Sequence, residues 1–170
     1  KDQTNWERTK EVINNFEKTY NTELLNLYRK KLGLQKEEKE DLKLVEELLN
    51  WMKDNTKDYT NTFRALSGDL NMLFDNKEGK VWHKKYLKRL TLEDTEKEEQ
   101  IELMNKSNPK YILRNYLAQK AIEEAEKGSF AELEKLLEVL KTPFEEKKDF
   151  EELAQDPPDW GRKLEISCSS

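Results

Sequence analysis

The sequence predicts an all-α fold, an irregular bundle of about five to seven helices with an extended C-terminal tail. Apolar residues recur at gaps of three, four and seven, which places them on one face of a helix. Glycine and proline are scarce, at 5 and 4 of 170 residues, so helices can run on with few breaks. No segment shows the sustained alternation of a sheet strand.

The first predicted helix carries one long apolar stripe and ends near Gly33, a natural C-terminal stop. Arg29, Lys30 and Lys31 precede this glycine, and basic residues suit the negative end of a helix. The stripe is made of Trp6, Ile13, Phe16, Tyr20, Leu24, Leu27 and Tyr28.

The next helices follow the same logic. A second helix is expected to begin with acidic residues in its first turn, as the positive helix end prefers. Asp58 is expected to cap a third helix. Residues 67–79 read as a short helix and a loop, and Val81 opens another helical stripe. The acidic first turn and the apolar positions of the second helix are Glu37, Glu38, Glu40, Leu42, Val45, Leu48, Leu49 and Met52.

Residues typical of helix caps predict where the helices of the C-terminal half begin. Asn108 before Pro109 predicts the start of a long helix that runs to Gly128. Ser129 and Glu132 then form a capping box that opens one more helix. Beyond Asp156 the sequence turns extended. We therefore divide the chain into a helical domain, residues 1–155, and a tail, residues 156–170, that ends in Ser-Cys-Ser-Ser.

The charge and hydropathy of the sequence argue against two classes of binding partner, nucleic acids and membranes. Charged residues make up 39% of the chain with both signs interleaved, and the net charge is −5. Nucleic-acid binding needs a clustered basic face, so no nucleic-acid partner is expected. No stretch approaches the length of an apolar membrane span, so no membrane partner is expected either. The chain does not begin with methionine and has no signal-peptide pattern, so we expect it to be part of a longer polypeptide.

The residues predict no catalytic site, metal site or cofactor site within this chain. Zinc sites need several Cys or His ligands, whereas His83 and Cys168 are the single examples of each and lie far apart. The five glycines are isolated, so no glycine-rich phosphate loop is present. Carboxylates are so frequent that no pair stands out as an acid and base.

Three small groups of residues are unusual enough to single out. Residues 58–64 combine a polar helix start with an aromatic residue, and we interpret them as a cap with Arg64 paired to a carboxylate. Arg114 and Asn115 lie inside the predicted apolar helix and are expected to make an inter-helix hydrogen bond. Cys168 lies near Glu165 and the terminal carboxylate, which do not acidify a thiol, so the residues alone favour an inert exposed cysteine.

These same residues make the chain resemble the C-terminal part of the selenoprotein O family, known in bacteria as YdiU. The resemblance rests on segments that occur in family order and cover nearly the whole chain. They are Tyr28-Arg-Lys-Lys-Leu-Gly-Leu34, Asp58-Tyr-Thr-Asn-Thr-Phe-Arg64, Asn108-Pro-Lys-Tyr-Ile-Leu-Arg-Asn-Tyr116, Pro157-Pro-Asp-Trp-Gly161 and Ile166-Ser-Cys-Ser-Ser170.

The resemblance implies a kinase-like core upstream that binds ATP and transfers AMP, with Mg or Mn, to Ser, Thr or Tyr hydroxyls of proteins. Its nucleotide and metal motifs lie outside this chain, so no catalytic residue is carried over. The resemblance also implies a redox role for Cys168, whose disulfide partner would lie upstream. This expectation opposes the one drawn from the residues alone. A cytoplasmic location is implied for a bacterial-type cysteine homologue, and a mitochondrial one for a eukaryotic protein.

Two functions therefore stay open. The chain is either the helical C-terminal region of a protein adenylyltransferase, which supports the core and presents Cys168, or a stand-alone helical module that binds a partner protein without enzymatic activity.

Overall fold

The computed structural model describes residues 2–164, and these residues form helices and no strand. The predicted all-α class is confirmed for this part of the chain. The described residues contain nine α-helices and one 3-10 helix, which is more than the sequence led us to expect. Four of these elements are only four to seven residues long, and such short helices leave almost no periodic signal.

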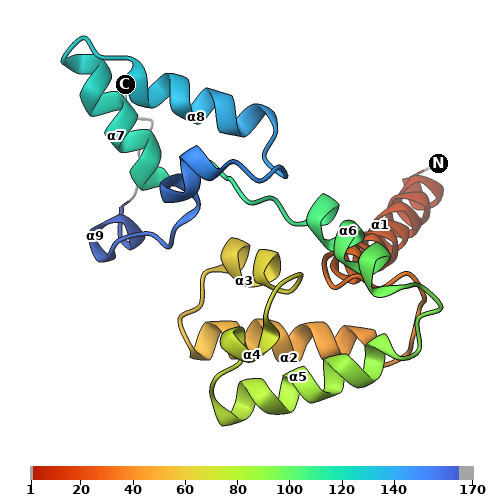
Figure 1. Ribbon diagram of the computed structural model, residues 1–170. Coiled ribbons are helices and arrows are strands. Elements are labelled where there is room, and N and C mark those ends of the chain that lie inside the picture. The colour runs from red at the N-terminus through yellow and green to blue at the C-terminus, as the bar shows by residue number, and fades with distance from the viewer. Residues whose placement is uncertain (1, 165–170) are drawn as a thin grey trace.

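The helices form two groups joined by an extended segment (Figure 1). The first group contains α1 to α6, and the second contains α7, α8, α9 and the 3-10 helix η1. In chain order the elements are α1 Asp2–Lys31, α2 Asp41–Asp54, α3 Tyr59–Ala65, α4 Leu70–Leu73, α5 Lys77–Leu90, α6 Lys97–Ser107, α7 Asn115–Glu126, α8 Ala131–Lys141, η1 Lys148–Ala154 and α9 Asp159–Arg162.

The first group packs around a core rich in aromatic rings. The rings of Trp51, Phe74, Trp82 and Tyr86 follow one another with centroids 4.7 to 5.0 Å apart. The Tyr86 hydroxyl donates a 2.7 Å hydrogen bond to the Leu32 carbonyl, which ties α5 to the end of α1. The other buried apolar residues of this core are Leu32, Leu34, Leu44, Val45, Leu48, Met52, Phe63, Leu66 and Met104.

The second group has a smaller core between α7 and α8. The Tyr111 hydroxyl donates a hydrogen bond to the Lys147 carbonyl, so the segment before α7 is held against the loop before η1. The buried residues of this core are Tyr111, Tyr116, Leu117, Ala121, Leu136, Val139 and Leu153.

The prediction that a helix begins at Pro109 is wrong. Residues 109–114 are not helical, and α7 begins at Asn115. The backbone N–H groups of Lys110 and Tyr111 donate to the Pro143 carbonyl, so their hydrogen bonds are made with the loop after α8 instead of within a helix. A tertiary contact thus overrides a local capping signal.

The capping box predicted at Ser129 is also wrong. Ser129 N–H donates to the Glu124 carbonyl, and Gly128 N–H donates to the Ala125 carbonyl. Together with the positive φ of Gly128, +87°, these bonds form a Schellman motif that closes α7. The backbone of Ser129 therefore belongs to the C-terminal cap of α7, and α8 begins without a side-chain cap.

Two further boundaries differ from expectation. The second helix begins at Asp41 and not at the glutamates before it. The Asp41 carboxylate does not face water, because it accepts hydrogen bonds from the Glu38 N–H and from two arginine side chains. The tail expected to be extended from Asp156 contains the short helix α9. Two other short helices agree with the sequence, since Asp58 caps α3 and α4 lies within residues 67–79, whereas η1 was not predicted.

Candidate functional site

The cysteine to which the resemblance gives a redox role, Cys168, lies outside the described residues, so that role stays a prediction. The chain just before it is held on α7. Asn115 donates from Nδ2 to the Leu164 carbonyl at 3.2 Å, and the Trp160 ring meets the Tyr116 ring edge-on at 5.9 Å. A Cβ added to Gly161 would lie 2.8 Å from the Cβ of Tyr116, so α9 sits directly on α7.

Four of the segments that carry the family resemblance contact one another where the two cores meet. Segments 28–34, 58–64 and 108–116 share hydrogen bonds there, and segment 157–161 packs on Tyr116. We call this region the junction and define it by Lys31, Asp58, Asn61, Arg64, Asn108 and Arg114.

Arg114 and Asp58 form the central ion pair of the junction. Arg114 donates from Nη1 to Asp58 Oδ2 at 2.5 Å and from Nη2 to Asp58 Oδ1 at 2.9 Å. Asp58 also accepts the Asn61 N–H as the cap of α3, and the Asn61 side chain accepts a further bond from Arg114. The side chains of the pair are only 7% and 13% exposed. Arg114 thus makes the predicted bond to a distant segment, but it does so from the extended residue before α7 and not from inside a helix.

The electrostatics of the pair agree with its geometry. Burial alone would raise the pKa of Asp58, but the hydrogen bonds from Arg114 and from the Asn61 N–H outweigh burial and hold that pKa below its ordinary value. The pKa of Arg114 is raised in turn, chiefly by its bond to Asp58. Both groups are therefore charged at neutral pH, and each is neutralised by the other.

Arg64 links the junction to the second group. Its Nη1 donates to the carbonyls of Asn105 and Asn108, and its Nη2 donates to the Phe144 carbonyl and to Glu146 Oε1 at 2.6 Å. The predicted carboxylate partner of Arg64 is therefore found, and it is Glu146.

Lys31 and Asn108 join the end of α1 to the extended segment. Asn108 is 1% exposed, donates from Nδ2 to the Lys31 carbonyl at 2.8 Å, and accepts from Lys31 Nζ at 3.2 Å. The ammonium group also lies over the Phe63 ring at 5.2 Å. Burial lowers the pKa of Lys31. Asn108 is thus a buried link between segments and not the helix cap that the sequence suggested.

A pocket beside the junction is lined by charged groups that already have partners. Lys110 binds both Glu146 and Glu151, and Glu146 also accepts from Arg64. The bond from Lys110 is the main reason that the pKa of Glu146 lies below its ordinary value. Because the cations are neutralised, this pocket is a poor anion site.

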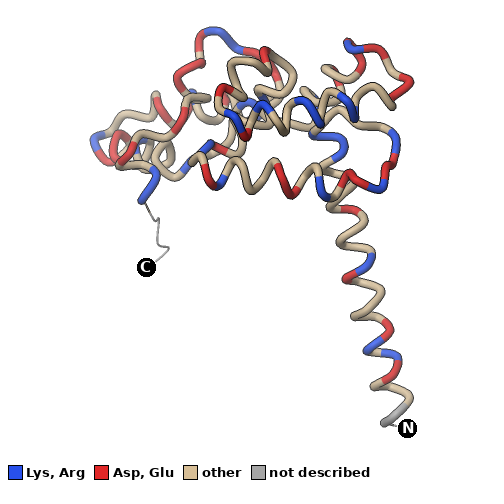
Figure 2. Tube along the Cα trace, turned by 90° about the horizontal axis from the view of Figure 1, so that it is seen from below, with Lys and Arg blue, Asp and Glu red and all other residues tan. Residues whose placement is uncertain are grey.

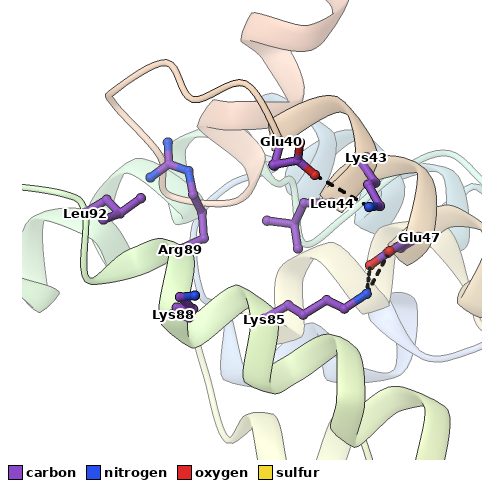
Figure 3. Close-up of a pocket in the computed structure, with 8 residues that line it drawn as sticks. All are labelled: Glu40, Lys43, Leu44, Glu47, Lys85, Lys88, Arg89 and Leu92. Carbon is purple, nitrogen blue, oxygen red and sulfur yellow. Dashed lines mark hydrogen bonds and ion pairs between the residues drawn. The ribbon is translucent and has the colours of Figure 1, made fainter.

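A second pocket lies between α2 and α5 (Figure 3). Lys85 donates to both oxygens of Glu47, and Lys43 lies 3.6 Å from Glu40. The Arg89 side chain points away from these pairs, toward the loop that precedes α2, and donates to Asp41. The pocket therefore presents no convergent set of groups for a reaction.

The described residues contain no cluster of side chains that could hold a metal ion. Among residues 2–164 no three His, Cys, Asp or Glu side chains lie close enough together to hold a metal ion. Asp41 and Asp58, the carboxylates at the centre of two charged clusters, face arginines, which compete with any cation. The lone histidine of the sequence, His83, stacks on the Phe74 ring instead. We therefore assign no ATP or metal contact here.

No helix in the described part of the chain is long and apolar enough to cross a membrane.

Comparison with known proteins identifies the family to which this helical region belongs. Residues 4–141 match the family described as "Protein adenylyltransferase SelO", and the chain belongs to that family. The resemblance drawn from the sequence is confirmed.

Relatives named "Protein nucleotidyltransferase YdiU" align over nearly the whole chain. One from Vibrio parahaemolyticus serotype O3:K6 is 39% identical over 178 residues, which cover 96% of this chain and 36% of the relative. One from Pseudomonas fluorescens SBW25 is 43% identical over 171 residues, with 95% and 35% covered. The chain thus spans about a third of the length of these relatives.

The sequence did not reveal which residues complete the junction. Lys31 and Asn108 are 77 positions apart, and Asn61 donates to Asp156 across 95 positions. Periodicity within a segment carries no trace of such contacts. Their one signal was that polar residues stood at positions where a helix face is otherwise apolar.

Proposed function

We propose that this chain is the C-terminal helical region of an enzyme that transfers AMP from ATP to Ser, Thr or Tyr hydroxyls of proteins. In that reaction the hydroxyl oxygen bonds to the α-phosphorus, the hydroxyl proton is lost, and pyrophosphate leaves. Nucleotide and Mg or Mn would bind to a kinase-like core outside this chain. Within this chain the junction would hold the two helical groups in one arrangement against that core.

The observation that carries the proposal is the match to the adenylyltransferase family over residues 4–141. The names of the relatives support transfer of a nucleotide to protein. A supporting role, in place of a catalytic one, agrees with the junction, where Arg114 is paired with Asp58 and Arg64 with Glu146.

AMP transfer is expected from the longer polypeptide and not from this chain alone. Each would be incubated with ATP, magnesium or manganese and a hydroxyl-bearing protein, and the intact mass of the acceptor would be measured. Addition of one AMP by the longer polypeptide supports the proposal. Addition by the 170-residue chain would place the chemistry here, and no addition by either would refute AMP transfer. If neither polypeptide adds AMP, the stand-alone binding module becomes the better account.

We further propose that Cys168 couples this activity to redox state. It is the one cysteine in the chain, so a disulfide partner would lie outside it. Exchange of Cys168 for serine in the longer polypeptide should abolish any change of AMP transfer on treatment with oxidant, because no disulfide can then form. Ser169→Ala, which alters the same tail without removing a thiol, is the control and should keep the oxidant response. A response that survives Cys168→Ser means that the redox role is wrong.

A further inference from the structure

One face of α1 carries a row of large apolar side chains that the described structure leaves in solvent. Residues 4–23 are exposed at every position. Figure 2 shows the helix projecting from the rest of the molecule. We define the α1 stripe as Trp6, Ile13, Phe16, Tyr20 and Leu27, which are 54% to 70% exposed.

The α1 stripe needs a partner for the helix to be stable. The end of α1 is anchored, because Leu25 and Tyr28 pack against the first core and Arg29 binds Asp41. The preceding turns have no such support. In proteins most of the stability of a helix comes from packing of its apolar face, so these turns lack their main support.

The spacing of the α1 stripe indicates what kind of surface covers it. Trp6, Ile13, Tyr20 and Leu27 recur every seven residues, and Phe16 lies between two of them. A seven-residue repeat keeps side chains in line along a helix that packs lengthwise against another helix. Large aromatic residues at the centre of such a row are typical anchors of protein interfaces. The partner is therefore expected to be a helical protein surface.

The charges beside the stripe argue against a membrane. Helices that lie on anionic membranes carry a polar face rich in lysine and arginine. Between residues 4 and 27 the acidic side chains outnumber the basic ones. The acidic ones are Glu7, Glu11, Glu17 and Glu23, and the basic ones are Arg8, Lys10 and Lys18. A mixed polar border of this kind is typical of the rim of a protein interface.

The relatives indicate where that surface comes from. The family match begins at residue 4, so α1 belongs to the family pattern. The Vibrio parahaemolyticus relative has 36% of its length covered by this chain, which leaves most of that protein outside the match. A surface on the same polypeptide also acts at a high effective concentration, whereas a second copy would have to associate from solution.

We propose that the α1 stripe is the docking surface for the nucleotidyltransferase part of the same polypeptide, which packs a helical face along it. The inference rests on the proposed function, because it requires a longer chain. It adds the surface by which the helical region is attached, and it makes α1 part of a continuous core in the complete protein.

Hydrogen exchange measured by mass spectrometry tests the proposal. In the longer polypeptide the amides of residues 5–27 should exchange at least about ten-fold more slowly than in the 170-residue chain. Phe16→Glu should restore the faster exchange, because a charge then faces the apolar partner. Asn15→Glu, one position away on the opposite face of α1, is the matched control and should leave the protection unchanged. If Phe16→Glu does not fold, Ile13→Ala replaces it and should reduce the protection.

Other outcomes would overturn the proposal. Fast exchange of α1 in the longer polypeptide would show that nothing covers the stripe. Slow exchange in the 170-residue chain, with the mass of a dimer in analytical ultracentrifugation, would identify a second copy as the occupant. Binding of the longer polypeptide to anionic phospholipid vesicles that Phe16→Glu abolishes would identify a membrane.

AMP transfer measured on the same wild-type preparation separates this inference from the proposed function. Activity together with an unprotected α1 refutes the docking surface alone. Protection of α1 without activity refutes AMP transfer alone.

Discussion

Replacement of Asp41 by alanine is expected to lower the free energy of unfolding by about 3–5 kcal/mol. Asp41 is completely buried. Its Oδ1 accepts from Arg89 Nε at 2.6 Å, and its Oδ2 accepts from Arg29 Nε at 2.7 Å and from the Glu38 N–H at 2.9 Å. One carboxylate therefore neutralises two buried guanidinium groups from α1 and α5.

The large effect follows from what the substitution leaves behind. Arg89 keeps a carboxylate partner, Glu93. Arg29 would keep its hydrogen bond to the neutral Asn26 side chain, and its one remaining carboxylate partner would be Glu37, which is 3.4 Å away and exposed. Removal of one member of a buried ion pair leaves an uncompensated charge, which costs more than the pair itself contributes. Urea unfolding followed by circular dichroism measures the change.

A neighbouring residue supplies the control for this prediction. Glu40→Ala removes an exposed carboxylate that lies 3.6 Å from Lys43, and a loss below about 1 kcal/mol is expected. Equal losses for Glu40→Ala and Asp41→Ala would mean that the buried network contributes no more than a surface pair.

Asp41 should also contribute to the dependence of stability on pH. Burial alone would raise its pKa, but the hydrogen bonds from Arg89, from the Glu38 N–H and from Arg29 outweigh burial, so the pKa in the folded protein lies below the ordinary value of 3.8. A carboxyl group of this kind stabilises the fold above its unfolded pKa and loses that contribution as the pH falls through the folded pKa. Stability should therefore fall below about pH 4, and the fall should be smaller in Asp41→Ala.

The sequence predicted those features of the fold that depend on neighbouring residues. The all-α class followed from periodicity. Asp58 could be recognised as a cap because a capping side chain binds an N–H only three positions further on, and it binds that of Asn61. Gly33 was recognised as a helix end, and it has a φ of +71° just beyond α1. In each case the stabilising contact lies within one turn of the residue that signals it.

Features that depend on distant segments could not be predicted in the same way. The Asn108-Pro109 pair is a sound local capping signal, but the Asn108 side chain binds Lys31 and the following N–H groups bind Pro143. Arg64 and Arg114 were correctly expected to find polar partners. Their partners, Glu146 and Asp58, are set by how the two cores pack together, and the sequence alone does not show that packing.

Replacement of Arg114 by alanine is expected to destabilise the chain by about 3 kcal/mol, because Asp58 would remain nearly buried without its counter-ion. Asp58 would keep the Asn61 N–H, so α3 would stay capped while one of the links between the two cores is lost. In a protein of this size the melting temperature should fall by roughly 6–12 °C. Arg114→Lys should lie between wild type and alanine, since an ammonium group retains the charge but cannot donate the two parallel bonds.

A double-mutant cycle with Asp58→Asn separates the pair from other effects of the substitution. If the ion pair carries the loss, the double variant should be more stable than the sum of the single losses predicts, with a coupling of at least about 1 kcal/mol. Arg162→Ala, which removes an exposed arginine 3.6 Å from Asp156, is the control and should cost below about 1 kcal/mol. Additive losses at Arg114 and Asp58 would mean that this charge pair does not hold the two cores together.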